Sequence, residues 1–269
     1  MDVEGMVERL KAAQKVWQRE TEQQPMPSEQ KYDCPICKDQ EILLIDDKAV
    51  VCECAAQKRL ARVMKSCNIS DEIQRKTFDA FGENVEPEIL EIKRMCEEYA
   101  RGLVKYYERK GSLVGAPSLG ICGTSGMGKT HLITAIAKVL LDETKALPVF
   151  FNWISSFKEW LGYYNSADNK DKVNEIRDKL YHADILIIDD LCKDGGNASW
   201  VNEMYGIIDY RYRKQLPIIF SSEHYAELVN LLSEAVFGRL REMTRSAKTG
   251  KYYMKTCFVQ PDENPLKYN

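Results

Sequence analysis

The sequence predicts an α/β protein in which helices cover both faces of a parallel sheet, with a small cysteine-containing module in front of it. Three observations predict this fold. From about residue 86, strand-length apolar runs alternate with segments of helical spacing; a glycine-rich turn separates one such strand from the next helix; and two close cysteine pairs lie before residue 55. Because parallel strands need helical crossovers, this alternation is typical of a parallel sheet. We expect two domains, residues 1–85 and residues 86–269.

Composition places the chain among ordinary globular proteins, with 44% apolar and 29% charged residues. It contains no run of 18 apolar residues, and the N-terminal stretch MDVEGMVERLKAAQKVW lacks the uninterrupted apolar core of a signal peptide. We therefore expect a cytoplasmic protein with no membrane association. Because the net charge is -3, any binding to nucleic acid must use a local basic surface.

The first 24 residues have helical spacing. Their apolar side chains, separated by three or four positions, form one stripe made of Val3, Met6, Leu10, Ala13 and Trp17. Two interpretations stay open: a helix that packs on its own domain, or a terminal helix that binds a partner. The polar, proline-containing segment that follows it, TEQQPMPSEQK, is compatible with the second.

The next segment contains the two cysteine pairs. Cys34 and Cys37 form a C-x-x-C turn, and Cys52 and Cys54 follow after a segment long enough for a hairpin. Four thiolates at such positions can converge tetrahedrally on Zn²⁺, as in closed structural sites. The sequence therefore favours a zinc ribbon-like knuckle over four unpaired buried thiols, although the C-x-C pair is tighter than usual.

From residue 86 onward each element has its own pattern. Helical spacing covers residues 88–111, 131–143, 173–183 and 203–215, and apolar strand-length runs cover residues 118–122, 147–153, 184–190 and 216–222. A further helix carries FGRLRE, and the segment after it is long enough for one strand and a tail.

The glycine-rich turn matches the phosphate-loop pattern G-x-x-x-x-G-K-[ST] between a strand and a helix. Its backbone N–H groups and the helix N-terminus would surround the phosphates of ATP, Lys129 would reach the outer phosphates, and Thr130 would ligate Mg²⁺. The predicted nucleotide-binding residues are Gly123, Thr124, Ser125, Gly126, Met127, Gly128, Lys129, Thr130 and His131.

A second acidic feature lies about sixty residues further on. The apolar run ILIIDD ends in Asp189 and Asp190. We expect Asp189 to hold Mg²⁺, directly or through water, and Asp190 to orient or polarise the attacking water.

Taken together and in this order, YDCPICKD, VVCECAAQKR, TFDAF, GICGTSGMGKTHL, ADILIIDDL, IIDYRYRKQLPIIFSS and FGRLRE resemble the DnaC/DnaI-type helicase loaders of bacteria and their phages. The resemblance runs from about residue 30 to residue 260. It implies an AAA+ P-loop NTPase module with strand order 5-1-4-3-2 and no helical lid, which would act as an ATPase.

The resemblance also implies partners. The N-terminal part would grip a hexameric replicative helicase of the DnaB type, while ATPase modules self-associate side by side and engage single-stranded DNA. Arg239 would then reach the γ-phosphate of a neighbouring subunit as a catalytic residue beside Lys129 and Asp190, although an exposed arginine is by itself usually surface. Arg211, Arg213 and Lys214 form a candidate basic surface.

Two positions depart from the pattern of that family. Glu223 stands where a neutral amide would contact the γ-phosphate, and a carboxylate there would repel that charge unless it turned away. Ala235 stands where many loaders carry a second arginine. We therefore expect slow or partner-dependent hydrolysis. Two alternatives remain: a transposase-helper ATPase, against which the cysteine module speaks, and a low-turnover nucleotide-binding adaptor or inhibitor of the helicase.

Overall fold

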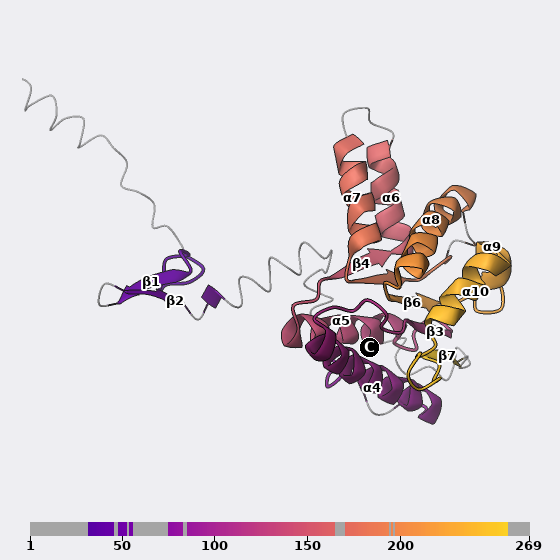
Figure 1. Ribbon diagram of the computed structural model, residues 1–269, viewed down its shortest axis with the longest axis horizontal. Coiled ribbons are helices and arrows are strands. Elements are labelled where there is room, and N and C mark those ends of the chain that lie inside the picture. The colour runs from indigo at the N-terminus through magenta and orange to yellow at the C-terminus, as the bar shows by residue number, and fades with distance from the viewer. Residues whose placement is uncertain are drawn as a thin grey trace, which may run out of the picture. The chain divides into compact units, whose positions relative to one another are not determined.

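The computed structural model describes residues 32–45, 48–52, 54–55, 75–82, 85–164, 170–193, 195 and 197–257. The chain divides into two compact units, Met1–Lys58 and Arg59–Asn269 (Figure 1). The predicted N-terminal helix lies outside the described residues, and the boundary predicted after residue 85 stays a prediction. Among the helices described, none is both long enough and apolar enough to cross a membrane.

The first unit contains an antiparallel hairpin of β1 (Ile42–Ile45) and β2 (Lys48–Val51), in which Ile42 lies opposite Val51. The hairpin joins the two cysteine pairs. Its buried cluster consists of Cys34, Cys37 and Cys52, with Leu43 and Cys54 packed against them. Among the described residues of this unit, the thiols therefore make up most of the buried core.

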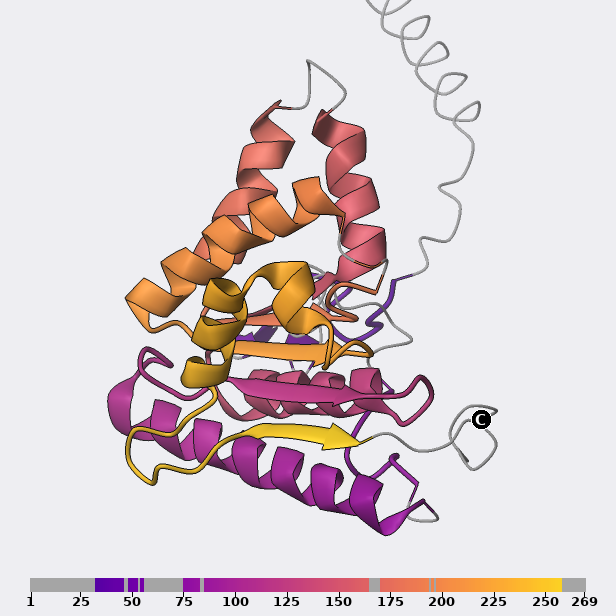
Figure 2. The same ribbon diagram turned by 90° about the vertical axis from the view of Figure 1, so that its right-hand side faces the viewer.

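The second unit is built on a five-stranded sheet in the order β4-β5-β6-β3-β7. The strands are β3 (Leu119–Gly123), β4 (Pro148–Asn152), β5 (Ile185–Asp189), β6 (Ile218–Ser222) and β7 (Met254–Cys257). All neighbouring pairs are parallel, and Figure 2 shows β6, β3 and β7 side by side with their arrowheads at one end. Numbered along this unit, the order is 5-1-4-3-2, which confirms the predicted fold class.

Helices cover both faces of this sheet. They are α4 (Pro87–Lys110), α5 (Lys129–Glu143), α6 (Trp153–Tyr164), α7 (Lys170–His182), α8 (Ala198–Lys214), α9 (Leu228–Leu232) and α10 (Glu234–Met243). Alternate residues of one strand belong to different cores: Ile185 and Ile187 pack with α4 and α5, whereas Leu186 and Ile188 pack with the other helices. In the described part of the chain, which ends at Cys257, no helix follows β7.

Two of the described helices, α6 and α9, were not predicted. The sequence pattern assigned Trp153 to the end of a strand, but Trp153 is the first residue of α6. Asn152 explains why α6 begins here, because its Oδ1 accepts hydrogen bonds from both the N–H and the hydroxyl of Ser155, each at 3.0 Å. A side-chain acceptor at this point satisfies an N–H that has no partner within the helix.

Candidate functional site

A cavity of about 590 Å³ lies at the end of the sheet where β3, β5 and β6 stop. Its walls come from the segment before α4, the phosphate loop, the start of α5 and the turns after β5 and β6. The lining residues are Lys76, Ala80, Phe81, Gly82, Ser125, Gly126, Gly128, Lys129, Thr130, His131, Asp190, Lys193 and Glu223.

The phosphate loop has the backbone shape that the motif predicts. Gly126 and Gly128 have φ angles of 83° and 84°, in the left-handed region that favours glycine. The buried ammonium of Lys129 donates to the carbonyl oxygens of Gly123 at 2.9 Å and Thr124 at 2.8 Å. Burial lowers the pKa of Lys129, and the nearby Glu223 opposes this shift. The loop therefore holds its cation beside the cavity.

Asp189 and Thr130 meet at the predicted magnesium site. The Thr130 hydroxyl donates to the two carboxylate oxygens of Asp189 at 2.9 and 3.0 Å, and the Ser221 hydroxyl donates to Oδ1 at 2.7 Å. Burial raises the pKa of Asp189, while the hydrogen bonds from Ser221 and Thr130 oppose the rise. A hydroxyl next to a fixed carboxylate is an oxygen donor set that suits Mg²⁺.

Asp190 lies at the cavity wall, where a base or water-orienting acid is expected. Its φ angle of 58° is unusual for a residue with a side chain, and its N–H donates to Ser221 Oγ at 2.9 Å. Its carboxylate accepts a hydrogen bond from Lys193 Nζ at 2.8 Å. Lys193 was not anticipated, because no pattern marks a lysine three residues after the acidic pair.

Glu223 follows β6 and faces the same cavity rather than turning away from it. Its Oε1 lies 3.7 Å from Lys129 Nζ and 3.6 Å from Lys193 Nζ. The carboxylate that the sequence predicts to be repulsive is therefore placed between two ammonium groups.

Two residues of the predicted loop set have other contacts. Met127 has no exposed surface and packs in the core with α4 and α5, so only its backbone could face a phosphate. His131 lines the cavity, but its Nε2 lies 2.6 Å from the carbonyl oxygen of Thr77 and its ring meets the edge of Phe81. Burial lowers the pKa of His131. This histidine holds the segment before α4 against the phosphate loop.

Arg239 lies on α10 and is not among the residues that line the cavity of its own chain. Its Nη1 lies 3.0 Å from Asp209 Oδ1, and its guanidinium lies over the rings of Tyr205 and Tyr212 at 5.7 Å from each centroid. About 28% of its side chain is exposed. Its role toward a neighbouring subunit stays a prediction.

Arg211 corrects the predicted basic surface on α8. Its side chain is fully buried and donates from Nη1 to the carbonyl oxygens of Leu180, Tyr181 and Ala183 and from Nη2 to that of Pro217. Burial lowers its pKa to about 9. Arg211 thus binds backbone at the end of α7, whereas Arg213 and Lys214 are exposed.

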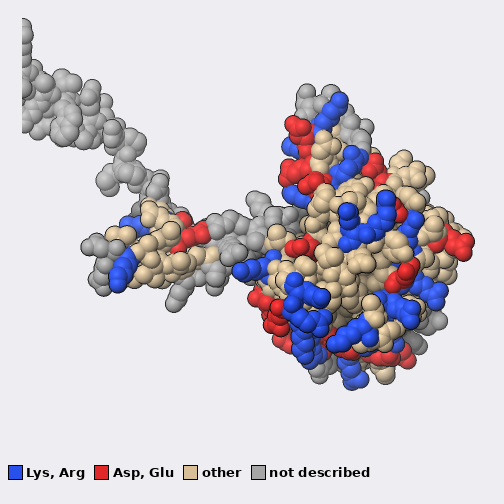
Figure 3. Space-filling model, in the orientation of Figure 1, with Lys and Arg blue, Asp and Glu red and all other residues tan. Residues whose placement is uncertain are grey.

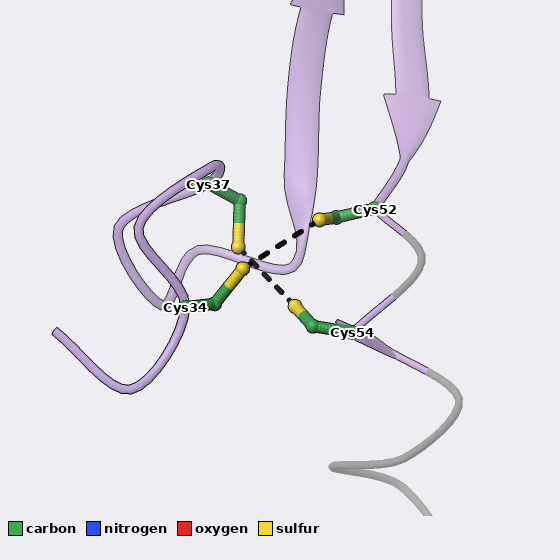
Figure 4. A group of neighbouring side chains, drawn as sticks. All are labelled: Cys34, Cys37, Cys52 and Cys54. Atoms are coloured by element: carbon green, nitrogen blue, oxygen red, sulfur yellow. Dashed lines mark hydrogen bonds between the residues drawn. The ribbon is translucent and has the colours of Figure 1, made fainter.

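The four predicted zinc ligands converge in the first unit (Figure 4). Their sulfur atoms all lie within 4.8 Å of one another, with Cys34 Sγ 3.9 Å from Cys52 Sγ and Cys37 Sγ 3.3 Å from Cys54 Sγ. Zn–S bonds of about 2.3 Å in a tetrahedron put sulfur atoms roughly 3.8 Å apart. Hydrogen bonding from the Cys37 backbone lowers the pKa of Cys34 to about 7, whereas the side-chain hydrogen bond to Cys37 raises the pKa of Cys54. Binding of Zn²⁺ would therefore have to displace protons from the cluster.

Donor chemistry at both sites fits the predicted groups. The first turn of α5 has N–H groups without helical acceptors, next to Lys129, which suits nucleotide phosphates. Thr124 Oγ1 is buried and, as far as the described residues go, has no hydrogen-bond partner. The four thiols fit Zn²⁺, because soft sulfur ligands in tetrahedral arrangement select it.

Comparison with known proteins agrees with this geometry. Residues 114–244 match the family described as bacterial DnaA ATPase domain. The chain is 27% identical over 224 residues to the phage-like element PBSX protein XkdC of Bacillus subtilis (strain 168). This match covers 79% of this chain and 80% of XkdC. It is 36% identical over 103 residues to the chromosomal replication initiator protein DnaA of Thermodesulfovibrio yellowstonii, but this match spans 23% of that protein.

Solved structures share the fold. The DnaC helicase loader has a TM-score of 0.50 at 17% identity and matches 71% of this chain and 100% of its own. DnaI has a TM-score of 0.51 at 21% identity, with coverages of 74% and 93%. DnaA bound to AMPPCP and single-stranded DNA has a TM-score of 0.52 at 18% identity, with coverages of 72% and 52%. The second unit therefore has the AAA+ fold of these replication proteins, and the predicted resemblance is confirmed.

Proposed function

We propose that this chain, whose ATPase part resembles those of DnaA, DnaC and DnaI, is an ATP-dependent loader of a hexameric replicative DNA helicase. The N-terminal domain would bind the helicase, and the AAA+ domain would bind ATP and single-stranded DNA. The observation that carries the proposal is the convergence of Lys129, Thr130, Asp189 and Asp190 around one cavity. Likeness to DnaC and DnaI supports the choice of a loader.

Each residue has a distinct task in this proposal. The Lys129 ammonium binds the outer phosphates, Thr130 and Asp189 supply oxygen ligands for Mg²⁺, and Asp190 orients the attacking water. Mg²⁺, when bound, neutralises phosphate charge. Arg239 acts on the site of a neighbouring subunit in a side-by-side assembly. The contacts of Arg239 with Asp209 and two tyrosines would keep its side chain ordered before the neighbouring subunit binds.

Helicase binding by the N-terminal domain is supported by the surface of its hairpin. Leu44 and Val51 are 77% and 72% exposed, and Ile36 is 66% exposed. Exposed apolar side chains on a small module of this kind are typical of a protein-binding surface. Zinc would fix the strands that present them.

Binding to single-stranded DNA is supported by a basic groove at the opposite end of the sheet from the ATP cavity. Two neighbouring cavities of about 390 and 450 Å³ share Gly115, Pro117 and Ala247. Lys105, Arg109 and Lys248 line the first, and Arg213 and Arg245 line the second, beside a single acid, Glu242. Figure 3 shows Lys and Arg side chains interspersed with Asp and Glu on the visible face of this unit, whereas the five basic side chains of the groove have one acid beside them. This local charge offers phosphate contacts that the net charge of -3 does not.

A low-turnover adaptor is the second candidate, and one observation favours it. Asp190 is engaged by Lys193 at 2.8 Å, so its carboxylate is partly neutralised before any nucleotide binds. Such a chain would bind ATP and hydrolyse it slowly. A transposase-helper ATPase is disfavoured by the cysteine module. We place the protein in the cytoplasm, where it would act in DNA replication.

The experiment that tests the proposal measures ATP hydrolysis by the full chain alone, with a DnaB-type hexameric helicase, and with helicase plus single-stranded DNA. We expect slow hydrolysis alone and stimulation by the partners. A pull-down with the helicase provides the second readout. Hydrolysis that never responds to either partner, together with no helicase capture, would reject the loader in favour of the adaptor or of a different partner.

A further inference from the structure

The turn after β5 carries Lys193 into the ATP cavity on a fixed backbone. Asp190 and Cys192 both have positive φ angles, of 58° and 62°, which residues with side chains rarely adopt. The Leu191 N–H donates to the Ser221 carbonyl at 2.8 Å, and the Lys193 N–H donates to the Asp190 carbonyl at 3.0 Å. Such backbone strain persists only where the surroundings hold it, and it clusters at ligand sites.

Lys193 and Glu223 face each other across the cavity wall although thirty positions separate them in the sequence. The Lys193 ammonium lies between the carboxylates of Asp190 and Glu223, at 2.8 and 3.6 Å. The same Glu223 oxygen lies 3.7 Å from Lys129 Nζ. Both lysines and Glu223 line the cavity, so the pair stands beside the place where Lys129 would hold the outer phosphates.

Neither Lys193 nor Glu223 alone suits a position beside the γ-phosphate. An ionised Glu223 has no hydrogen to donate to a phosphate oxygen and would repel it. A lone Lys193 would pair fully with Asp190, the acid that the proposed reaction needs. At this wall the carboxylates of Asp190 and Glu223 pair with Lys193, and Glu223 also with Lys129. A further carboxylate, Asp189, lies next to them on Thr130. A negatively charged γ-phosphate therefore needs the second cation.

We propose that Lys193 contacts the γ-phosphate of ATP and that Glu223 is its positioning residue, so that a lysine–glutamate pair distinguishes ATP from ADP. The inference rests on the proposed ATP binding at this cavity. The γ-phosphate draws the ammonium of Lys193 away from Asp190, and Glu223 keeps it at the wall. Asp190 then becomes free to act only when the γ-phosphate is present.

The test measures the affinities of the full chain for ATP and ADP, each with Mg²⁺, by competition with a fluorescent nucleotide. Lys193→Met should weaken ATP binding about 10- to 100-fold, because it removes a charge-assisted hydrogen bond, and should change ADP binding less than about threefold. Lys193→Arg keeps the cation and should stay within about threefold of the parent for ATP. Lys145→Met, which removes an exposed lysine outside the cavity, is the matched control.

Glu223→Gln separates positioning from simple repulsion, because its effect should reverse between two backgrounds. In the parent it should weaken ATP binding, since Lys193 loses its anchor. In Lys193→Met it should strengthen ATP binding, since it removes an uncompensated charge. Thermal unfolding of every variant identifies any loss of folding.

Three results would overturn the inference. They are an unchanged ATP-to-ADP affinity ratio in Lys193→Met, stronger ATP binding by Glu223→Gln in the parent, and equal effects of Glu223→Gln in both backgrounds. A different result would overturn the proposed function. If the parent chain binds neither ATP nor ADP, and Lys129→Ala makes no difference to this, then both the proposed ATP site and the role of the Lys193–Glu223 pair are wrong.

Discussion

Replacing Arg211 with alanine should destabilise the second unit without touching its surface. The guanidinium binds four carbonyl oxygens, and those of Leu180 and Tyr181 lie in the last turn of α7, where carbonyls lack partners within the helix. The Pro217 oxygen would keep a hydrogen bond from the N–H of Leu186 at 3.2 Å, and leaving the other three carbonyls unpaired costs about 1 kcal/mol each at the low end of the usual range. Water entering the vacated space recovers part of this, and the cavity adds to it.

The expected loss in the free energy of unfolding is therefore about 3 to 5 kcal/mol, the size found when a buried charge network is broken. For a unit of this length, that loss should lower Tm by roughly 6 to 20 °C. Urea and thermal unfolding of the full chain, followed by circular dichroism, measure both quantities.

Arg213→Ala is the matched control, two positions away on the same helix. Its side chain is 70% exposed and pairs with Asp209. We expect a change within about 0.5 kcal/mol, because surface ion pairs contribute little. Unfolding of Arg211→Ala within about 0.5 kcal/mol of the parent, combined with a loss of DNA binding, would refute the buried assignment and restore the surface one.

The remaining predictions concern the two sites. Lys129→Ala should weaken ATP binding more than about tenfold, whereas Asp190→Asn should bind ATP like the parent and lose turnover by about 100-fold or more; equilibrium binding and steady-state hydrolysis separate the two. Metal analysis of purified protein should find one zinc per chain, and Cys34→Ser should lose it; a metal-free parent with a normally folded first unit would contradict the site. Arg239→Ala should lose about 10³-fold in turnover only at protein concentrations that allow assembly, and full activity there would make this arginine a surface residue.

Local patterns were enough to predict the strands and the phosphate loop. Four consecutive apolar residues, Ile185 to Ile188, form a strand because both faces of the sheet are covered, and the loop glycines adopt the positive φ angles that their residue type permits. Strand order came only from resemblance, since a local pattern carries no information on which strands pair. The start of α6 was missed because an aromatic stretch after a strand looks like more strand, while the signal, the cap at Asn152, lies in one side chain.

The site was predicted up to the point where chemistry depends on two distant residues at once. Glu223, considered alone, is a repulsive acid, and Lys193, considered alone, is an ordinary turn lysine. Their meaning changes when the sheet brings the ends of β5 and β6 together, because each then offsets the charge of the other beside Lys129. Arg211 shows the same dependence in reverse: an arginine in a basic helix end looks like surface until the carbonyls of a neighbouring helix are seen to need it. Charge in a sequence is thus a reliable guide to function only after the partners that neutralise it are known.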